Sequence, residues 1–325
     1  MTKVLVAGGA GYIGSHTCLD LFRNGFIPVV YDNLSNGHAE FVKWGPLEVG
    51  DIRDRGKLEE VLRKHKPVAI VHFAAAIEVG QSVKDPAAYY DNNVSGTIAL
   101  LRAAQATGID KLVFSSTCAT YGIPVSTPME ESHPQLPINP YGRSKLMVEQ
   151  ILRDLDLYEG FRSFILRYFN AGGADPEGRI GEWHSPETHA IPIAIEAALG
   201  RRPYFEVLGT DYGTRDGTCV RDFVHVLDLA SAHTRAVEHL LTNGESHVLN
   251  LGTGHGTTVK EMLETIQHVV GKQLKLKYGP RREGDSPVLV ADSTSAKQTL
   301  GWSPRHDLRS IVDSAWNWHS NCMPR

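Results

Sequence analysis

The stretch "KVLVAGGAGYIGSHTCLDLFRNG", residues 3–25, decides the fold. It begins with the apolar run 4–7, which is typical of a parallel strand buried on both faces. Three glycines follow this run at short spacing: Gly8, Gly11 and Gly14. Glycine permits a tight strand-to-helix turn and a close approach of backbone to phosphate, and the N-terminus of the following helix attracts anions. The pattern therefore predicts a dinucleotide-binding turn.

Apolar segments alternate with helical patterns further along the chain. Four more segments are predicted to be buried strands: residues 27–32, 68–76, 111–116 and 163–170. Strands that alternate with helices pack as a parallel sheet with helices on both faces. We therefore expect an α/β fold, namely a Rossmann-type doubly wound parallel sheet with a second, smaller α/β domain. Ligands of such sheets bind outside the carboxyl ends of the strands.

An acidic residue ends the second predicted strand. Asp32 lies 18 residues after Gly14, where a carboxylate can accept hydrogen bonds from an adenosine ribose. Because this carboxylate would repel the extra phosphate of NADP, we expect NAD; the alternative is a surface aspartate that caps the loop 32–37. Asp51 and Ile52 follow a short third strand, where an acid beside an apolar residue could hold and cover an adenine ring.

A tyrosine and a lysine lie four residues apart in "NPYGRSKLMVEQ", residues 139–150. Tyr141 and Lys145 would share one face of a helix, which packing alone could also explain. A free tyrosine has a pKa near ~10, and a neighbouring positive charge lowers it toward the value that suits a catalytic base. The hydroxyls of residues 115–117 follow a strand that ends at the same rim as the glycine turn. We expect a hydroxyl to hold a substrate oxygen, the phenolate to take its proton, and the lysine to tune the phenol and bind the nicotinamide ribose.

Composition argues against several classes of protein. The chain has 325 residues with 42% hydrophobic and 22% charged side chains, as in globular proteins, and its net charge of −4 argues against a nucleic-acid partner. Its 4 cysteines form no CxxC pair, which indicates a reducing compartment. We find no signal peptide and no apolar run long enough for a membrane helix, so we expect a cytoplasmic protein with no membrane partner. His16, His72, His225 and His255 lack ligand spacing, so we expect no metal.

Nine segments carry a family resemblance. They are "GGAGYIG" (8–14), "YDNLSNG" (31–37), "HFAA" (72–75), "YYDNNVSGT" (89–97), "FSSTCATYG" (114–122), "PYGRSK" (140–145), "LRYFNAGGA" (166–174), "DGTCVRDFVHV" (216–226) and "RREGD" (281–285). In this order they resemble the extended short-chain dehydrogenase/reductase family, and within it the enzymes that epimerise carbon 4 of UDP-sugars. The resemblance covers nearly the whole chain.

The resemblance implies a role for each matching position. The catalytic residues would be Thr117, Tyr141 and Lys145. The cofactor, NAD, would be bound by Gly8, Gly11, Tyr12, Ile13, Gly14, Asp32, Asn33, Asp51, Ile52, Phe73, Ala74, Ala75, Asn92, Ser115, Tyr141, Lys145 and Tyr168. The UDP-sugar would be bound by Thr117, Tyr141, Phe169, Asn170, His189, Ala190, Arg221, Leu289, Arg282 and Asp285.

The implied reaction is an internal oxidation and reduction. Tyr141 would remove the proton of the 4-hydroxyl while NAD takes the hydride from carbon 4. The resulting 4-keto sugar would turn over and receive the hydride on its other face. Because NAD is not consumed, it should stay bound to the protein.

The loosening of the strict strand–helix alternation from about Gly172 predicts a domain organisation, and the resemblance implies a homodimer. Residues 1–170, with 219–251 returning to them, would form the NAD-binding Rossmann domain. Residues 171–218 and 252–325 would form a smaller nucleotide-sugar-binding domain. A homodimer would form through the helix around residues 94–107 and the helix that carries Tyr141.

The chain departs from the family pattern in three places. Ile77 and Glu78 stand where a lysine often follows the "HFA" segment, so NAD would be held less tightly. Leu289 would occupy the wall behind the sugar, where tyrosine excludes N-acetyl sugars and cysteine or serine admits them. Acceptance of the N-acetyl sugars therefore stays open. Ala190 replaces a commonly larger aliphatic residue in the uridine region.

Three other functions are compatible with the same fold. A sugar-nucleotide dehydratase would need acid and base carboxylates beside Thr117, where the chain has Cys118 and Ala119. A 4-epimerase of another UDP-sugar (xylose/arabinose, glucuronate or N-acetylglucosamine) would carry nearly the same motifs. A non-catalytic NAD-binding regulator could dispense with Tyr141 or Lys145, and both are present.

Overall fold

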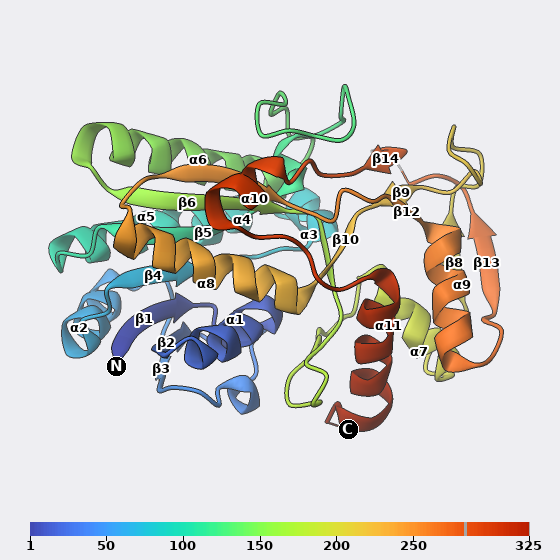
Figure 1. Ribbon diagram of the computed structural model, residues 1–325, viewed down its shortest axis with the longest axis horizontal. Helices are drawn as coiled ribbons and strands as arrows, with labels where there is room; N and C mark the ends of the chain where they lie inside the picture. Colours follow the sequence, from blue (N-terminus) through green and yellow to red (C-terminus); the bar gives the residue numbers. More distant parts are fainter. Residues whose placement is uncertain (283–284, 325) are drawn as a thin grey trace. The chain divides into compact units, whose positions relative to one another are not determined.

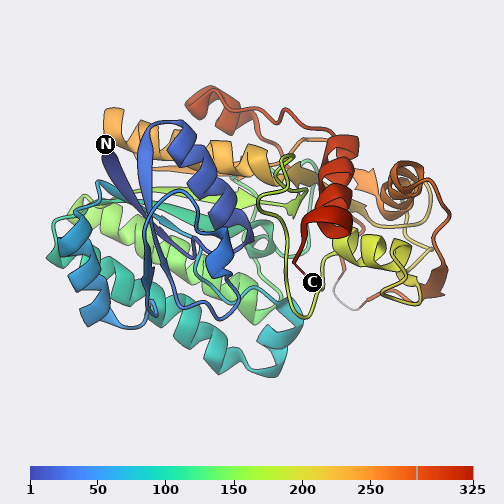
Figure 2. The same ribbon diagram turned by 90° about the horizontal axis from the view of Figure 1, so that it is seen from below.

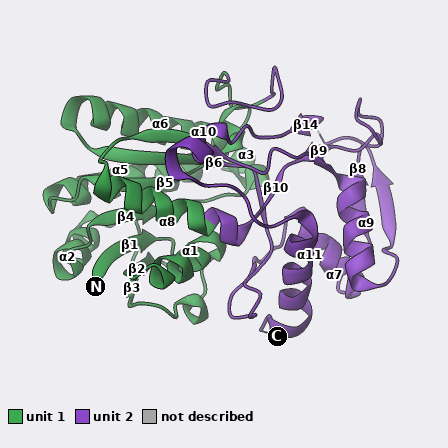
Figure 3. Cartoon of the chain, in the orientation of Figure 1, with its two compact units in different colours: residues 1–122, 134–167, 230–249 green, residues 123–133, 168–229, 250–325 purple. Residues whose placement is uncertain are grey.

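The computed structural model describes residues 1–282 and 285–324, so Glu283 and Gly284 of the "RREGD" segment and Arg325 lie outside the described residues. The chain divides into two compact units, which Figure 3 colours separately. Unit 1 comprises Met1–Gly122, Pro134–Arg167 and Ala230–Leu249. Unit 2 comprises Ile123–His133, Tyr168–Leu229 and Asn250–Arg325.

Unit 1 is built on a seven-stranded sheet in the order β11-β6-β5-β4-β1-β2-β3. Its strands are β1 (Thr2–Ala7), β2 (Phe26–Asp32), β3 (Leu47–Val49), β4 (Ala69–His72), β5 (Lys111–Thr117), β6 (Arg162–Tyr168) and β11 (His247–Leu251). β1 pairs in parallel with both β2 and β4, and the pairs β2–β3 and β4–β5 are also parallel. The predicted Rossmann-type sheet is thus confirmed. From β1 the chain adds β2 and β3 on one side and β4, β5 and β6 on the other, so the direction of winding reverses between β1 and β4. Such sheets bind ligands at this position.

Helices cover both faces of this sheet, as Figures 1 and 2 show. They are α1 (Tyr12–Arg23), α2 (Arg55–His65), α3 (Val79–Lys84), α4 (Pro86–Tyr90), α5 (Gly96–Ala106), α6 (Pro140–Glu159) and α8 (Val226–Thr242), with the short turns η1 (Ala39–Phe41), η2 (Asp91–Ser95) and η3 (Cys118–Thr120). α2, α5 and α6 lie along one face, and α1 and α8 lie along the other. The doubly wound arrangement is therefore also confirmed.

The strands are apolar on both sides because both faces are covered. Leu5 and Ile70 point to one face, where they belong to the same buried cluster as Leu58 of α2 and Val148 of α6. The next residue along β1, Val6, points to the opposite face and is also 0% exposed. Truncating one of these buried leucines to alanine costs about 2–5 kcal/mol in comparable cores.

Unit 2 is a smaller α/β unit made of short elements. Its strands are β7 (Asn170–Gly172), β8 (Phe205–Leu208), β9 (Val220–Arg221), β10 (Phe223–His225), β12 (Thr257–Thr258), β13 (Leu276–Gly279) and β14 (Val288–Leu289). Its helices are α7 (Ala190–Ala198), α9 (Val259–Val270), α10 (Thr294–Leu300) and α11 (Leu308–Asn317), followed by the turn η4 (Trp318–Cys322). The strands form the sheets β10-β7, β12-β9-β14 and β13-β8. Residues of α7, α9 and α11 share one apolar core with β8.

The return of the chain to unit 1 begins later than expected. We predicted a return at residue 219, whereas the structure places it at Ala230, inside α8. Residues 220–225 stay in unit 2 because β9 pairs with β14 and β10 pairs with β7. Strands of two or three residues carry no readable periodicity, so the sequence could not indicate this pairing.

A second segment, Ile123–His133, also belongs to unit 2, whereas we expected all of residues 1–170 to lie in the NAD-binding domain. Met129 forms a parallel bridge with Ala291, and its carbonyl oxygen accepts a hydrogen bond of 2.9 Å from Nδ2 of Asn250.

Every helix among the described residues is too short or too polar to span a bilayer.

Candidate active site

The glycine turn between β1 and α1 is packed too tightly for side chains. Gly8 has φ +82°, and a Cβ atom there would lie 2.5 Å from the backbone nitrogen of Ala74. A Cβ atom on Gly14 would lie 2.1 Å from the carbonyl oxygen of Gly8. The turn therefore lies against the backbone that follows β4. The first turn of α1 contains no acidic residue, so its N-terminus can attract an anion.

Asp32 fixes this turn from the end of β2. Its two carboxylate oxygens accept hydrogen bonds from the backbone N–H groups of Ala10 at 3.0 Å and Leu34 at 2.9 Å. The residue is 8% exposed, and burial raises the pKa of the carboxyl while the two hydrogen bonds oppose that rise. The predicted ribose-binding acid therefore also holds together the two loops at the carboxyl ends of β1 and β2.

The structure also brings Asn33 and Asp51 together. Nδ2 of Asn33 donates a hydrogen bond of 3.2 Å to Asp51, and the guanidinium of Arg53 lowers the pKa of the Asp51 carboxyl well below its usual range. Ile52 is only 5% exposed. A Cβ atom on Gly96 of α5 would lie 2.7 Å from Cδ1 of Ile52, so this side chain packs on the helix.

A buried asparagine that we did not predict supports the loop after β4. Oδ1 of Asn93 accepts a hydrogen bond of 2.8 Å from the N–H of Ala76, and its Nδ2 donates to the carbonyl oxygen of Ala76 and to Oγ of Ser144, both at 3.0 Å. The predicted residue Asn92 donates to Oδ1 of Asn93 at 2.9 Å. Asn93 thus joins the predicted cofactor loop, which includes Phe73, to α6.

Hydroxyl groups at the end of β5 point to alternate sides of the strand. Oγ of Ser116 donates a hydrogen bond of 2.6 Å to Glu149, which commits it to the interior. Oγ1 of Thr117 accepts a hydrogen bond of 3.1 Å from the N–H of Ala119. A hydroxyl that accepts one bond keeps its own proton for a substrate oxygen. Thr117 therefore fits the predicted role better than Ser116.

Helix α6 presents Tyr141 beside this strand end. Asn139 caps the helix by accepting a hydrogen bond of 2.8 Å from the N–H of Gly142, and Pro140 occupies the first turn. A Cβ atom on Gly142 would lie 2.5 Å from the carbonyl oxygen of Ala119. The start of α6 is thus packed on η3, the turn that directly follows Thr117.

Lys145 reaches the same strand from the next turn of α6. Its Nζ donates a hydrogen bond of 2.8 Å to the carbonyl oxygen of Ser115 and lies 4.8 Å from the centre of the Phe114 ring. The side chain is almost completely buried, and burial lowers its pKa to about 7, although the nearby charge of Glu149 opposes the change. Burial therefore disfavours the charged form of this lysine.

A second buried network lies behind Lys145. The guanidinium of Arg167 on β6 forms an ion pair of 2.6 Å with Glu149 on α6 and donates a hydrogen bond of 2.9 Å to the hydroxyl of Tyr121. Both charged residues are 0% exposed. The network ties α6 to β5 and β6, and we did not predict it. The only sequence signal was the spacing of four residues between Lys145 and Glu149.

The remaining predicted residues lie in unit 2, where three of them converge. Oδ1 of Asp285 lies 2.7 Å from Nη2 of Arg282 and 3.4 Å from Nη2 of Arg221. Leu289 on β14 pairs directly with Arg221 on β9. The predicted nucleotide-binding charges and the predicted wall behind the sugar are therefore neighbours.

Other predicted residues of unit 2 lie on separate elements. Asn170 begins β7, where its N–H donates to the carbonyl oxygen of Asp222 at 3.0 Å. Phe169 is 7% exposed, and Tyr168 ends β6. His189 and Ala190 begin α7. Burial opposes a charge on His189, but the carboxylates of Glu182 and Glu187 outweigh this effect and raise its pKa to about 10.

Comparison with known proteins agrees with this geometry. The chain matches the family model described as GDP-mannose 4,6 dehydratase over residues 5–315. It is 69% identical to a UDP-glucose 4-epimerase of Rhizobium meliloti over 318 residues, which cover 98% of this chain and 97% of that protein.

Two crystal structures are closely similar. The UDP-glucose 4-epimerase of Brucella ovis in complex with NAD has a TM-score of 0.95 and 50% identity, and the match covers 97% of this chain and 98% of that one. The enzyme of Stenotrophomonas maltophila with bound NAD and formylated UDP-arabinopyranose has a TM-score of 0.96 and 41% identity, with 98% of each chain covered. The chain therefore belongs to the extended short-chain dehydrogenase/reductase family. Within that family it belongs to the UDP-glucose 4-epimerases, which confirms the predicted resemblance.

Proposed function

We propose that the chain is an NAD-dependent 4-epimerase, an isomerase that interconverts UDP-glucose and UDP-galactose through a transient 4-keto sugar. The observation that carries this proposal is the pair Tyr141 and Lys145 on α6, whose start is packed on the turn after Thr117. The proposed catalytic residues Thr117, Tyr141 and Lys145 belong to two elements of unit 1, β5 and α6, and this supports the proposal. The high identity to named epimerases supports the same conclusion.

The residues of unit 1 fit a bound NAD. The glycine turn leaves backbone N–H groups and the N-terminus of α1 for a pyrophosphate, and Asp32 favours a ribose with a free 2′-hydroxyl. Asn33 and Asp51 would bind the adenosine half. NAD, when bound, accepts the hydride of carbon 4 and returns it to the other face.

The protein contributes proton transfer and orientation. Thr117 holds the oxygen on carbon 4, and Tyr141 takes its proton when the 4-keto sugar forms and returns a proton when it is reduced. The positive charge of Lys145 favours the phenolate of Tyr141. The hydrogen bond from Nζ of Lys145 to the carbonyl oxygen of Ser115 orients the ammonium one turn along the helix that carries Tyr141.

The residues of unit 2 are assigned to the UDP group. Arg221 and Arg282 share the single carboxylate of Asp285, so the three side chains together retain a positive charge that suits a diphosphate. Asn170, Phe169, His189 and Ala190 are assigned to the remainder of the nucleotide, as the family resemblance implies. Leu289 is assigned to the wall that selects the sugar.

The other functions have weaker support. A dehydratase would require carboxylates beside Thr117, whereas Cys118 and Ala119 follow it and form the turn η3. The bound formylated UDP-arabinopyranose in the Stenotrophomonas maltophila structure keeps 4-epimerisation of other UDP-sugars as the second candidate.

We also propose a cytoplasmic homodimer with a role in galactose metabolism.

The test is the conversion of UDP-galactose to UDP-glucose by purified protein with no NAD added. Conversion would support both the epimerase function and a retained cofactor. Conversion only after NAD is supplied would support the chemistry and would assign the weaker retention to Ile77 and Glu78. Failure under both conditions would overturn the UDP-glucose proposal, and UDP-arabinose, UDP-glucuronate and the N-acetyl sugars would be tested next.

A further inference from the structure

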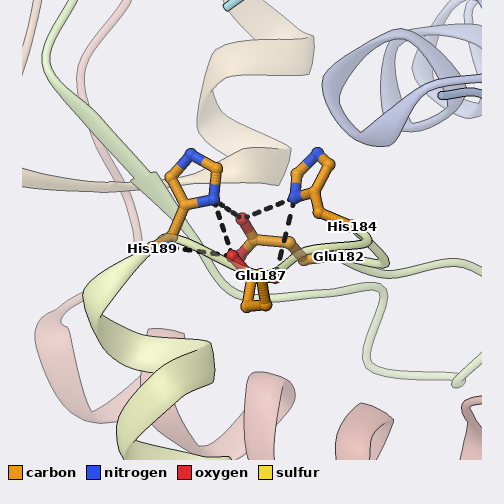
Figure 4. Close-up of side chains that lie close together, drawn as sticks. All are labelled: Glu182, His184, Glu187 and His189. Atoms are coloured by element: carbon orange, nitrogen blue, oxygen red, sulfur yellow. Dashed lines mark hydrogen bonds and ion pairs between the residues drawn. The ribbon is translucent and has the colours of Figure 1, made fainter. Parts of the chain in front are cut away.

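Four potential metal ligands converge in the loop that precedes α7. The run E-x-H-x-x-E-x-H over residues 182–189 supplies them: Glu182, His184, Glu187 and His189. One ligand atom from each residue lies within 4.8 Å of the others. Figure 4 shows both carboxylates and both imidazole Nδ1 atoms directed toward the same point. From sequence we missed this run because we considered four other histidines and looked for helical ligand spacing.

The distances around His184 suit an ion better than a hydrogen bond. Its Nδ1 lies 3.4 Å from Oε1 of Glu182 and 3.6 Å from Oε2 of Glu187. Good hydrogen bonds are shorter, near ~3 Å. Ligand atoms at about 2.0–2.2 Å from a tetrahedral Zn²⁺ are separated by about 3.3–3.6 Å. Nδ1 of His189 lies 2.9 Å from each carboxylate, so those two contacts would lengthen by about 0.5 Å around an ion.

The two carboxylates are buried and need positive charge. Glu182 is 3% exposed and Glu187 is 8% exposed. Oε2 of Glu187 accepts no hydrogen bond from the described part of the chain. Buried charges are stable only when they are paired or bind a metal. The carboxylates raise the pKa of both imidazoles despite burial, so two protonated imidazoles balance the two carboxylates in the metal-free site, and one divalent cation with two neutral imidazoles gives the same balance.

The surrounding structure holds the ligands in place. Oε1 of Glu187 accepts hydrogen bonds from the backbone N–H groups of Thr188 at 2.7 Å and His189 at 2.8 Å. The carbonyl oxygen of Glu182 accepts a hydrogen bond of 2.9 Å from Nε1 of Trp318, and that of Glu187 accepts one of 3.0 Å from Arg202. Such outer contacts orient metal ligands in proteins. Both ends of the run are therefore anchored.

We propose that Glu182, His184, Glu187 and His189 form a structural zinc site in unit 2. A mixed nitrogen and oxygen set with four protein ligands suits Zn²⁺ and leaves no open position for chemistry. The ion fixes the loop that leads into α7 and hence the positions of His189 and Ala190. It takes no part in the proton or hydride transfer of the proposed function.

The number of zinc ions bound per chain by the wild-type protein is the first measurement. The purified protein is stripped of metal with a chelator, mixed with Zn²⁺ and freed of excess metal. Its zinc content per chain is then determined by mass spectrometry. We expect about one zinc per chain and a rise in Tm when Zn²⁺ is restored. Substitution with Co²⁺ should give the strong visible absorption of a tetrahedral site. Zinc at background level, or only the weak absorption of octahedral cobalt, would overturn the proposal and leave an ion-pair cluster only.

Variants locate the site. We expect His184→Asn to weaken zinc binding by at least about 10-fold. The matched control is His247→Asn, because His247 belongs to a second group with His239 and Glu245 in unit 1. Glu182→Gln provides a second test if His184→Asn does not fold, as judged by circular dichroism. Unchanged zinc affinity in the folded variants, or its loss only in His247→Asn, would overturn the assignment. These readouts do not depend on turnover, so they stand apart from the test of the epimerase.

Discussion

The ammonium of Lys145 lies 2.8 Å from the carbonyl oxygen of Ser115, a residue of the strand that ends at Thr117. This one hydrogen bond connects α6, which carries Tyr141, to β5, which carries the predicted substrate hydroxyl. The helix fixes the spacing of the phenol and the ammonium, and the hydrogen bond fixes the ammonium relative to the strand. The relative positions of the proposed base Tyr141, the ammonium of Lys145 and the proposed substrate hydroxyl of Thr117 therefore depend on α6 and β5 of unit 1.

Replacement of Tyr141 by phenylalanine should remove the base and leave the site's shape unchanged. We expect Tyr141→Phe to retain NAD and to lower turnover of UDP-galactose by about 10²–10⁴-fold. The matched control is Tyr158→Phe, since Tyr158 lies on the same helix and is 79% exposed. A coupled assay for UDP-glucose together with the absorbance of bound NAD measures both properties. Wild-type turnover in Tyr141→Phe would mean that another group is the base.

The buried charge of Lys145 should lower the free energy of unfolding of the protein, although the proposed reaction requires this residue. The folded pKa of about 7 lies below the unfolded value near ~10.4, so the unfolded chain binds more protons between these pH values. The destabilisation is complete below about pH 7 and is relieved as the pH rises toward ~10.4. We expect Lys145→Met to abolish turnover while raising the free energy of unfolding of cofactor-free protein at pH 7 by on the order of a few kcal/mol.

The measurement for Lys145→Met is urea unfolding of cofactor-free protein at several pH values. The control is Arg143→Met, which removes an exposed cation from the same helix. If Lys145→Met is less stable than the wild type at pH 7, the contacts with Ser115 and Phe114 outweigh the cost of the buried charge.

Removal of one charge from the ion pair between Glu149 and Arg167 should lower the free energy of unfolding, whereas removal of the charge of Lys145 should raise it. Both residues are fully buried, so removing one charge leaves the other without compensation. We expect Glu149→Gln to lower the free energy of unfolding by about 3–5 kcal/mol. Glu159→Gln, an exposed position on the same helix, should change it by less than about 0.5 kcal/mol. Equal effects of the two substitutions in thermal unfolding would show that the buried network does not stabilise α6.

Asp32 should govern the choice between NAD and NADP. We expect Asp32→Ser to weaken NAD binding by roughly 10-fold or more, because its charge-assisted hydrogen bonds are lost, and to improve NADP binding relative to NAD. Fluorescence titration of cofactor-free protein measures both affinities. Asp54→Ser is the control, because Asp54 also accepts a backbone hydrogen bond but only at the start of α2. A preserved preference for NAD in Asp32→Ser would assign cofactor selection to another residue.

Leu289 should set the space available behind the sugar. Because Leu289 pairs with Arg221 in the strand register, a larger side chain there would act close to the proposed diphosphate-binding arginine. We expect Leu289→Tyr to lower any activity on UDP-N-acetylglucosamine while most activity on UDP-galactose remains. The ratio of kcat/KM for the two sugars measures the effect. An unchanged ratio would remove Leu289 from the specificity wall.

The sequence predicted the elements of unit 1 better than those of unit 2, for a physical reason. Strands such as β1 and β5 are buried on both faces, so their apolar runs are plain, and the turn after β1 requires Gly8 and Gly14 because a Cβ atom has no room there. In unit 2, β9 and β14 have two residues each, and their pairing depends on contacts between distant segments.

The buried polar residues that support the site could not be predicted from the sequence either. Asn93 was passed over in favour of its neighbour Asn92, and Glu149 and Arg167 lie on different elements whose contact is visible only once the sheet is assembled. Hydrogen-bond networks of this kind depend on three-dimensional proximity, which residue spacing along a single helix cannot reveal. Residues that match a family motif were identifiable, whereas those that hold them in place were not.

The discontinuity of unit 1 has a consequence during protein synthesis. Strand β11 is an edge of the seven-stranded sheet and neighbours β6, yet the segment Tyr168–Leu229 of unit 2 separates these two strands in the chain. A nascent chain that has not reached residue 247 therefore presents β6 with one unpaired backbone edge. Such edges recruit other strands and promote aggregation. Chains that stop before β11 should accordingly depend on chaperones, and truncation after Arg167 should not yield an isolated, well-behaved Rossmann domain.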